Sequence, residues 1–190
     1  KIIDQIIREL KAARTIAVAG HMRPDGDCIG SELAIGYALK NLGKKVTVFS
    51  QDEMPDKLAF LDPGKILTGP RTPRPYDAAV VVDCANFERM GAICDSISKR
   101  GPLINIDHHG SNTRYGEINW IDAQSASSGE LIYRLLNQAK WPITATIADC
   151  LFTAISTDTG SFQYPTTQPS TYHAAAELVN RGANLARICE

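Results

Sequence analysis

Short apolar runs alternate with segments of helical periodicity along the first half of the chain. Residues 2–13 place apolar groups at helical spacing, and the apolar run TIAVAG that begins at Thr15 is typical of a buried strand. Residues 29–42 again have a helical pattern and end at Gly43, a residue suited to the helix C-cap. Residues 45–50 form the second predicted strand. The pattern therefore predicts a strand, a loop, a helix and a strand in succession.

The middle of the chain repeats this order after an irregular connection. Residues 52–76 are rich in proline and weakly periodic, so we expect them to cross the surface without regular structure. Residues 78–82 and 103–106 are apolar and predict two further strands, while residues 87–100 can form a helix between them. Strands that alternate with helices predict a mostly parallel sheet with helices on both faces.

The last third of the chain is predicted to be helical. Three segments have helix-starting residues followed by apolar spacing, namely 128–139, 144–156 and 169–180. With 190 residues the chain is long enough for one well-packed core but too short for two full domains. We therefore expect a single α/β domain, residues 1–190, with a helical C-terminal part.

Composition and charge narrow the classes of partner. The formal net charge is -1 and the basic residues are scattered, so the chain lacks the basic stripe that binds long nucleic acids. No apolar run is long enough to span a bilayer, and the five cysteines form no CxxC pair. These features predict a cytoplasmic protein that acts on small substrates away from the membrane.

Acidic and imidazole side chains follow three of the predicted strands. The strand ends read AGHMRPDGD, VVVDC and INIDHHG, and a further segment, ISTDTGSF, follows an apolar helix. Because ligands bind at the carboxyl ends of parallel strands, we expect these side chains to meet at one edge of the sheet. The candidate residues are His21, Asp25, Asp27, Asp83, Asp107, His108, His109 and Asp158.

Each motif alone has an ordinary structural explanation, since PDG is a common turn and an Asp after a strand is often a helix cap. Together, so many carboxylates at one edge would repel one another unless they bound a cation. Carboxylate and imidazole ligands without thiolates suit Mn²⁺, with Mg²⁺ as the alternative. The number of ligands exceeds the need of one octahedral ion and predicts two ions about 4 Å apart.

The same motifs resemble those of a known family. HMRPDGDCIGS, the Asp of VVVDC, the DHH triplet of IDHHGSN and STDTGSF match, in order, the four motifs of DHH superfamily phosphoesterases. The resemblance covers residues 20–162. Four motifs in the right order are far more specific than a lone DHH triplet.

The resemblance implies a role for each candidate residue. One metal ion would be held by His21, Asp25 and Asp83. The second would be held by Asp27, Asp83, His108 and Asp158, so that Asp83 bridges the two ions. Asp107 would hydrogen-bond a ligating imidazole and fix its orientation. His109 would contact the phosphate.

The resemblance also implies a reaction and a class of substrate. A metal-bridging hydroxide would attack phosphorus in line. The run SASSGELIYRLL and the segment AAAELVNRGANLARI look most similar to the group that degrades very short RNA or dephosphorylates 3'-phosphoadenosine 5'-phosphate, whose relatives cleave dinucleotides. We therefore expect a short RNA or nucleotide substrate.

Such enzymes usually carry a smaller C-terminal domain that grips the substrate, and we expect that domain to be absent from this chain, which ends at Glu190.

Two alternatives inside the class are a manganese-dependent inorganic pyrophosphatase and a single-strand exonuclease of the RecJ type. The exonuclease is disfavoured because the chain lacks a basic and aromatic surface that would track a strand. An alternative from another class is a nucleotide- or partner-binding domain without hydrolytic activity. A homodimer is compatible with the sequence.

Overall fold

A six-stranded parallel sheet forms the centre of the computed structural model, which describes residues 1–189. The strand order is β3-β2-β1-β4-β5-β6, and every neighbouring pair is parallel. The strands are β1 (Thr15–Ala19), β2 (Lys45–Phe49), β3 (Leu67–Thr68), β4 (Ala78–Val82), β5 (Leu103–Asp107) and β6 (Ile118–Ile121). The predicted fold class, a parallel α/β sheet with helices on both faces, is confirmed.

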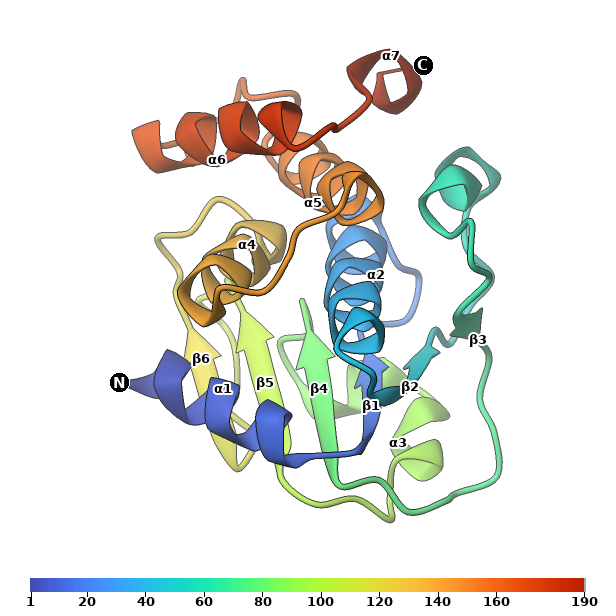
Figure 1. Cartoon of the computed structure of the whole chain (residues 1–190). Helices are drawn as coiled ribbons and strands as arrows, with labels where there is room; N and C mark the ends of the chain where they lie inside the picture. The colour runs from blue at the N-terminus through green and yellow to red at the C-terminus, as the bar shows by residue number, and fades with distance from the viewer. Residues whose placement is uncertain (190) are drawn as a thin grey trace.

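The two faces of the sheet are covered unequally. The longer helices are α1 (Ile2–Ala12), α2 (Gly26–Asn41), α4 (Ser128–Ala139), α5 (Ala145–Asp158) and α6 (Pro169–Asn180). Figure 1 shows α1, α2 and α4 against one face of the sheet, with α5 stacked on α2 and with α6 and α7 (Leu185–Ile188) farthest from the strands. Among residues 1–189, the short elements η2 (Phe87–Met90) and α3 (Ile93–Ser96) cover the other face.

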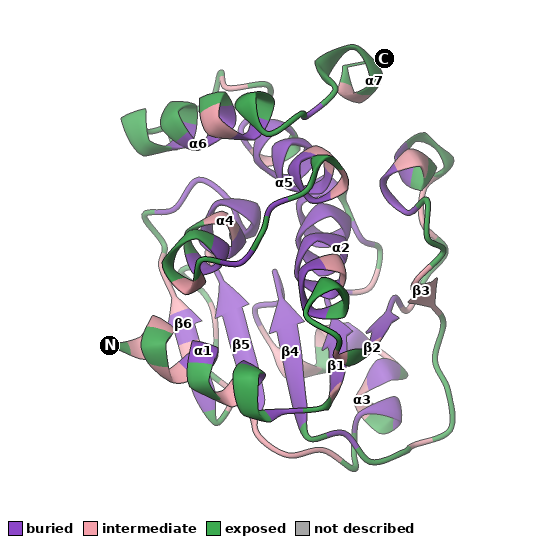
Figure 2. Cartoon of the chain, viewed as in Figure 1, coloured by how far each residue is buried: buried purple, intermediate pink, exposed green. Residues whose placement is uncertain are grey.

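Side chains that point alternately to the two faces of the sheet form two separate cores. In β1, Ile16 and Val18 pack into the core under the long helices, whereas Ala17 and Ala19 face the core under η2 and α3. Successive side chains of a strand point to opposite faces, so a strand covered on both sides must be apolar throughout. Figure 2 shows the strands β1, β4 and β5 as buried, whereas α6 and α7 expose much of their surface. Within residues 1–189, no helix is both long and apolar enough to cross a membrane.

The predicted helix over residues 87–100 is wrong in extent. The structure has two short pieces there, η2 and α3, separated by Gly91. Gly91 has φ of +61°, a left-handed conformation that ends the 3₁₀ turn before an α-helix can propagate. The remaining residues up to Arg100 lead into β5 through a turn.

Two strands and a 3₁₀ helix in the connecting segments were not predicted. Residues 52–76 contain the 3₁₀ helix η1 (Asp56–Leu61) and the two-residue strand β3, which extends the sheet beyond β2. The segment after the DHH triplet contains β6, which pairs with β5. Both strands are short edge strands, whose apolar pattern is too brief to stand out from a loop. The three predicted C-terminal helices are confirmed as α4, α5 and α6.

The order of the strands fixes where a ligand can bind. The chain leaves β1 toward β2 on one side and leaves β4 toward β5 on the other, although β1 and β4 are neighbours. Connections that diverge from adjacent strands open a crevice at the carboxyl ends of those strands. The segments that follow β1, β4 and β5 therefore meet at this point, as the sequence predicted.

Candidate metal centre

The segment after β1 places three candidate ligands around the start of α2. Asp25 is the N-cap of α2, and its Oδ1 accepts hydrogen bonds from the N–H groups of Asp27 and Cys28 at 3.0 Å each. The other oxygen, Oδ2, lies 4.0 Å from Nε2 of His21. Nδ1 of His21 is 2.8 Å from the carbonyl oxygen of Met22, which leaves Nε2 to face the carboxylates. Asp25 therefore caps a helix with one oxygen and joins the candidate site with the other.

Asp83 lies at the centre of the site, directly after β4. Its φ of +52° is a left-handed conformation that is uncommon for residues other than glycine. Its Oδ2 lies 3.4 Å from Nε2 of His21, while its Oδ1 lies 3.6 Å from Nε2 of His108. Oδ1 also accepts a hydrogen bond from the hydroxyl of Ser128 at 3.0 Å. Each oxygen of this buried carboxylate thus faces a different imidazole.

Three carboxylates surround the ring of His108, the middle residue of the triplet. Its Nε2 lies 3.3 Å from Oδ2 of Asp158, 3.6 Å from Oδ1 of Asp83 and 3.7 Å from Oδ2 of Asp27. Asp158 is the last residue of α5, where the helix ends beside the strand edge. Segments more than 130 residues apart in the sequence therefore converge on one nitrogen atom.

Asp27 is fixed by the N-terminus of α4. Its two oxygens accept the N–H groups of Ser128 and Gly129 at 2.8 Å each, and Oδ1 also accepts from the hydroxyl of Ser31 at 3.2 Å. The free N–H groups of a helix N-terminus stabilise negative charge. A side chain at Gly129 would collide with Ala154, because an added Cβ would lie 2.5 Å from the Cβ of that residue. The glycine lets α4 approach both α5 and the carboxylate.

Four carboxylates lie close together in this site, and no lysine or arginine among residues 1–189 forms an ion pair with them. Burial, together with the charges of Asp83 and Asp158, raises the pKa of Asp27 well above its usual value. Burial also raises the pKa of Asp158, to which the charges of Asp83 and Asp25 contribute. Burial opposes ionisation of Asp83 as well, but the neighbouring histidines lower its pKa on balance. Throughout residues 1–189, the ion pairs of these four carboxylates are with histidines and not with lysine or arginine.

Asp107 and His109 form a pair beside this cluster. Oδ1 of Asp107 lies 2.7 Å from Nδ1 of His109, and this hydrogen bond raises the pKa of His109 to about 8. Asp107 also accepts the N–H of His108 at 2.9 Å and the side-chain amide of Asn112 at 2.7 Å. The resemblance implied that Asp107 would orient a ligating imidazole. The structure instead places it on the ring of His109, while Nδ1 of His108 lies 3.4 Å from the carbonyl oxygen of Ser125.

The donor set fits divalent metal ions. Two overlapping groups of side chains bring their ligand atoms within 4.8 Å of one another around His108: Asp83, His108 and His109, and Asp27, His108 and Asp158. Oxygen and imidazole donors at this spacing suit Mn²⁺ or Mg²⁺. Buried carboxylates that face one another without a lysine or arginine gain most from such an ion, because it removes their mutual repulsion.

Sequence reasoning missed the residues that hold the carboxylates in place. Ser128 and Gly129 donate hydrogen bonds to Asp27, although both are far from it in the sequence. Asn112 lies in a loop and donates a hydrogen bond to Asp107. The run SASSG predicts a helix start and contributes to the family resemblance, but neither indicates a contact with Asp27. Ser31 lies inside α2, and its hydroxyl donates a hydrogen bond to Asp27. A hydroxyl four residues after a ligand on the same helix was the one available signal.

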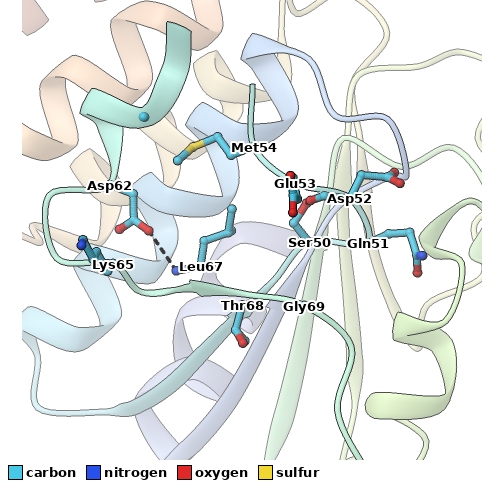
Figure 3. Close-up of a pocket in the computed structure, with 11 residues that line it drawn as sticks. Ser50, Gln51, Asp52, Glu53, Met54, Asp62, Lys65, Leu67, Thr68 and Gly69 are labelled. Carbon is cyan, nitrogen blue, oxygen red and sulfur yellow. Dashed lines mark hydrogen bonds between the residues drawn. The ribbon is translucent and has the colours of Figure 1, made fainter. Parts of the chain in front are cut away.

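A separate hollow lies beside the strand edge near β2 and β3 (Figure 3). Its lining includes Ser50, Asp52, Met54, Asp62 and Leu67. Oδ2 of Asp62 accepts the N–H of Leu67 at 3.0 Å, the bond drawn in the figure. The hollow contains none of the predicted metal ligands, so it is distinct from the carboxylate cluster.

Comparison with known proteins places the chain among phosphoesterase relatives. The family model described as "DHH family, N-terminal domain" matches residues 15–155. The protein "Bifunctional oligoribonuclease and PAP phosphatase NrnA" of Thermus thermophilus is 32% identical over 100% of this chain. The protein of the same name from Bacillus subtilis is 30% identical over 92% of the chain. The chain spans 56% of the length of each of these relatives.

Solved structures share the fold. An exopolyphosphatase-related protein from Bacteroides fragilis superposes with a TM-score of 0.90 at 26% identity, covering 98% of this chain and 58% of its own. A putative family II inorganic pyrophosphatase from Methanococcus jannaschii (TM-score 0.67, 22% identity, 88% of this chain and 56% of its own) shares the fold alone. So does the exonuclease RecJ, solved with manganese (TM-score 0.54, 16% identity, 96% of this chain and 47% of its own). This chain belongs to the DHH family, because the family model matches residues 15–155, most of the length of the chain.

Proposed function

We propose that this chain is the catalytic domain of a two-metal phosphoesterase that hydrolyses short oligoribonucleotides, linear dinucleotides or 3'-phosphoadenosine 5'-phosphate. The observation that carries the proposal is the position of Asp83. Its two oxygens lie 3.4 Å from Nε2 of His21 and 3.6 Å from Nε2 of His108. A carboxylate that faces two separate imidazoles has the geometry expected of a ligand shared by two ions.

The remaining candidates divide between two metal positions. His21, Asp25 and Asp83 would hold the first ion. The second position takes its ligands from four segments: Asp27, Asp83, His108 and Asp158. The donor group of Asp27, His108 and Asp158 supports the second position, while His21 and Asp83 belong to a separate donor group. We propose Mn²⁺ as the native ion because imidazole donors favour it over Mg²⁺.

The protein's own side chains would position the substrate. Two bound ions would supply an activated water and would stabilise the charge of the entering and leaving oxygens. His109 is held at Nδ1 by Asp107 at 2.7 Å, so its Nε2 is free to donate a hydrogen bond to a phosphate oxygen. The hydroxyl of Ser128 donates a hydrogen bond to Oδ1 of Asp83 and fixes this carboxylate.

The class of substrate follows from the relatives and from the charge of the chain. Two relatives, 32% and 30% identical to this chain, are both named as bifunctional oligoribonucleases and PAP phosphatases. A net charge of -1 without a basic stripe favours short substrates over long nucleic acids. We further propose that residues 1–190 form one catalytic domain and that a smaller C-terminal domain completes substrate binding. All five cysteines are free thiols, which supports a cytoplasmic location.

The alternatives have weaker support. Inorganic pyrophosphatase activity rests on a structural neighbour at 22% identity, which carries the fold alone. A binding domain without hydrolytic activity would have no need to retain every ligand of both metal positions.

The test is release of mononucleotide or phosphate from pApA, a five-nucleotide RNA, 3'-phosphoadenosine 5'-phosphate and pyrophosphate, each with Mn²⁺. The protein with Asp83→Asn is compared with Asp122→Asn as the matched control. Asp122 follows β6 at the same strand edge, but it pairs with Arg134 at 2.8 Å and stands outside the cluster. We expect Mn²⁺-dependent turnover that Asp83→Asn abolishes and Asp122→Asn retains.

Preference for pyrophosphate over the nucleotides would replace the proposed substrate class. If the chain, and any longer protein that contains it, bound Mn²⁺ without turning over any of the four compounds, the hydrolase proposal would fail and a binding role would remain.

A further inference from the structure

A thiol lies within reach of the first metal position. Cys28 is fully buried, one residue after Asp27 in the first turn of α2. A nitrogen of His21, Sγ of Cys28 and an oxygen of Asp83 all lie within 4.8 Å of one another. The pair formed by His21 and Asp83 thus has two neighbours that could complete a set of ligands: the carboxylate of Asp25 and the thiol of Cys28.

The two neighbours differ in chemistry. The side chain of Asp25 is 60% exposed and offers a hard oxygen, which suits Mn²⁺ and Mg²⁺. The side chain of Cys28 is buried and offers a soft sulfur, which suits Zn²⁺ and similar ions. Three protein ligands of mixed nitrogen, oxygen and sulfur type match a tetrahedral zinc position with one place left open.

A second buried group accompanies the thiol. Glu32 is fully buried one helical turn further along α2, with Oε1 3.4 Å from Sγ of Cys28. Its Oε2 has no hydrogen-bond partner among residues 1–189. A buried carboxyl oxygen without a partner is costly unless a cation or a donor lies close to it. A metal ion on Sγ would bring positive charge next to this carboxyl group.

Gly20 provides the space for both side chains. A Cβ at this position would lie 2.3 Å from Oε1 of Glu32 and 2.4 Å from Sγ of Cys28. The residue after β1 therefore has to be glycine to leave room for the thiol and the carboxyl group. The space that holds Cys28 and Glu32 is therefore formed by the backbone at Gly20 and does not depend on a mobile surface side chain.

We propose that Cys28 is a thiolate ligand of the first metal position, recruited by Zn²⁺ or Cd²⁺ together with His21 and Asp83 and left as a thiol when Mn²⁺ is bound. Binding breaks the S–H bond, forms a metal–sulfur bond and releases the proton to solvent, with no change of oxidation state. The inference rests on the proposed function, because it assumes the metal position at His21 and Asp83.

Co²⁺ tests the inference without an activity assay. Co²⁺ substitutes for Zn²⁺, absorbs visible light when bound to nitrogen and oxygen, and gains a near-ultraviolet charge-transfer band when a thiolate binds it. We expect the unmodified protein to show both absorptions and Cys28→Ser to lose only the charge-transfer band. The matched controls Cys94→Ser and Cys189→Ser, a half-buried and an exposed cysteine, should keep it.

The outcomes separate the two proposals. Visible absorption without a charge-transfer band in the unmodified protein would overturn the role of Cys28 and leave the metal centre intact, even if Cys28→Ser did not fold. Loss of the band in Cys94→Ser or Cys189→Ser would assign it to another thiol and overturn the inference. If Co²⁺ produced no absorption at all, the metal centre itself would fail.

Affinity measurements distinguish a ligand from a purely structural residue. Cys28→Ser should weaken Cd²⁺ binding by about tenfold or more and change Mn²⁺ binding by less than about twofold, because only the soft ion uses sulfur. Equal weakening for both ions in calorimetric titrations would show that Cys28 merely packs beside the site.

Discussion

Two buried aspartates near the same edge of the sheet have opposite surroundings. Asp62, in the hollow of Figure 3, accepts the N–H groups of Ile66 and Leu67 at 2.9 and 3.0 Å and the hydroxyl of Tyr37. Asp27 accepts two backbone N–H groups as well, but it shares its space with the carboxylates of Asp83 and Asp158.

The difference shows what marks a functional carboxylate in this protein. Burial and hydrogen bonds from neutral donors are common to both residues, so neither feature identifies a metal ligand. Asp62 organises the loop before β3, and its three donors satisfy its carboxylate. Asp27 belongs to a group of acids that need a shared cation. The number of neighbouring carboxylates is therefore more informative than burial.

The largest expected effect is on catalysis. Asp27→Asn should lower Mn²⁺-dependent turnover by at least about 100-fold, because it removes a charged ligand and leaves one oxygen to accept the two N–H groups of α4. Asp62→Asn should leave turnover within about twofold and lower only the free energy of unfolding, by about 1–2 kcal/mol. Steady-state kinetics and urea unfolding of both variants check the contrast. Equal losses of activity would erase the distinction between the two sites.

Metal binding should stabilise the protein only through the crowded site. At a Mn²⁺ concentration about 100 times the dissociation constant, binding adds about 2.7 kcal/mol to the free energy of unfolding. For a chain of 190 residues this should raise Tm by about 5–10 °C. The rise should persist in Asp62→Asn and shrink strongly in Asp83→Asn. Thermal scans with EDTA or Mn²⁺ measure it, and an undiminished rise in Asp83→Asn would place the metal elsewhere.

Glu32 extends the comparison to a fully buried carboxyl group whose Oε1 accepts from the thiol of Cys28 and whose Oε2 has no hydrogen-bond partner among residues 1–189. Burial raises its pKa from 4.5 to about 8. A raised pKa means that the folded state binds the proton more tightly than the unfolded state, so this stabilisation is complete below about pH 4.5 and is lost as the pH rises toward 8. In metal-free protein at pH 9, Glu32→Gln should therefore raise the free energy of unfolding by about 2 kcal/mol.

The control for Glu32→Gln is the same measurement at pH 5, where the variant should differ little from the unmodified protein because Glu32 is then protonated. Denaturant unfolding at both pH values provides the comparison. A variant that is destabilised equally at both pH values would show that the carboxyl group makes a hydrogen bond on which the fold depends.

The smallest expected effect concerns the support of Asp83. Ser128→Ala removes the hydroxyl that donates to Oδ1 of Asp83 at 3.0 Å, and turnover should fall by about tenfold. Ser125→Ala is the control, because its hydroxyl bonds to the carbonyl oxygen of Ser127 and not to the cluster. Kinetics over a range of Mn²⁺ concentrations should show a weaker apparent metal affinity for Ser128→Ala alone.

Long elements and motif positions were predictable from the sequence, whereas short elements and contacts were not. The four central strands have apolar runs with no competing interpretation, and α4, α5 and α6 have both caps and periodicity. The helix expected over residues 87–100 failed because one left-handed glycine outweighs the propensity of its neighbours. The strands β3 and β6 owe their existence to pairing with β2 and β5, which no local pattern reveals.

The candidate site divides in the same way. The motif positions predict which acids and imidazoles gather at the strand edge, because parallel strands place their carboxyl ends together and the apolar runs identify those ends. The fold adds that Asp83 faces both His21 and His108, that Asp107 bonds to His109, and that α4 supports Asp27. These contacts join segments from different parts of the chain through side-chain directions set by packing. Sequence periodicity specifies a face or an end of an element, but it carries no information on which distant atom lies within hydrogen-bonding distance.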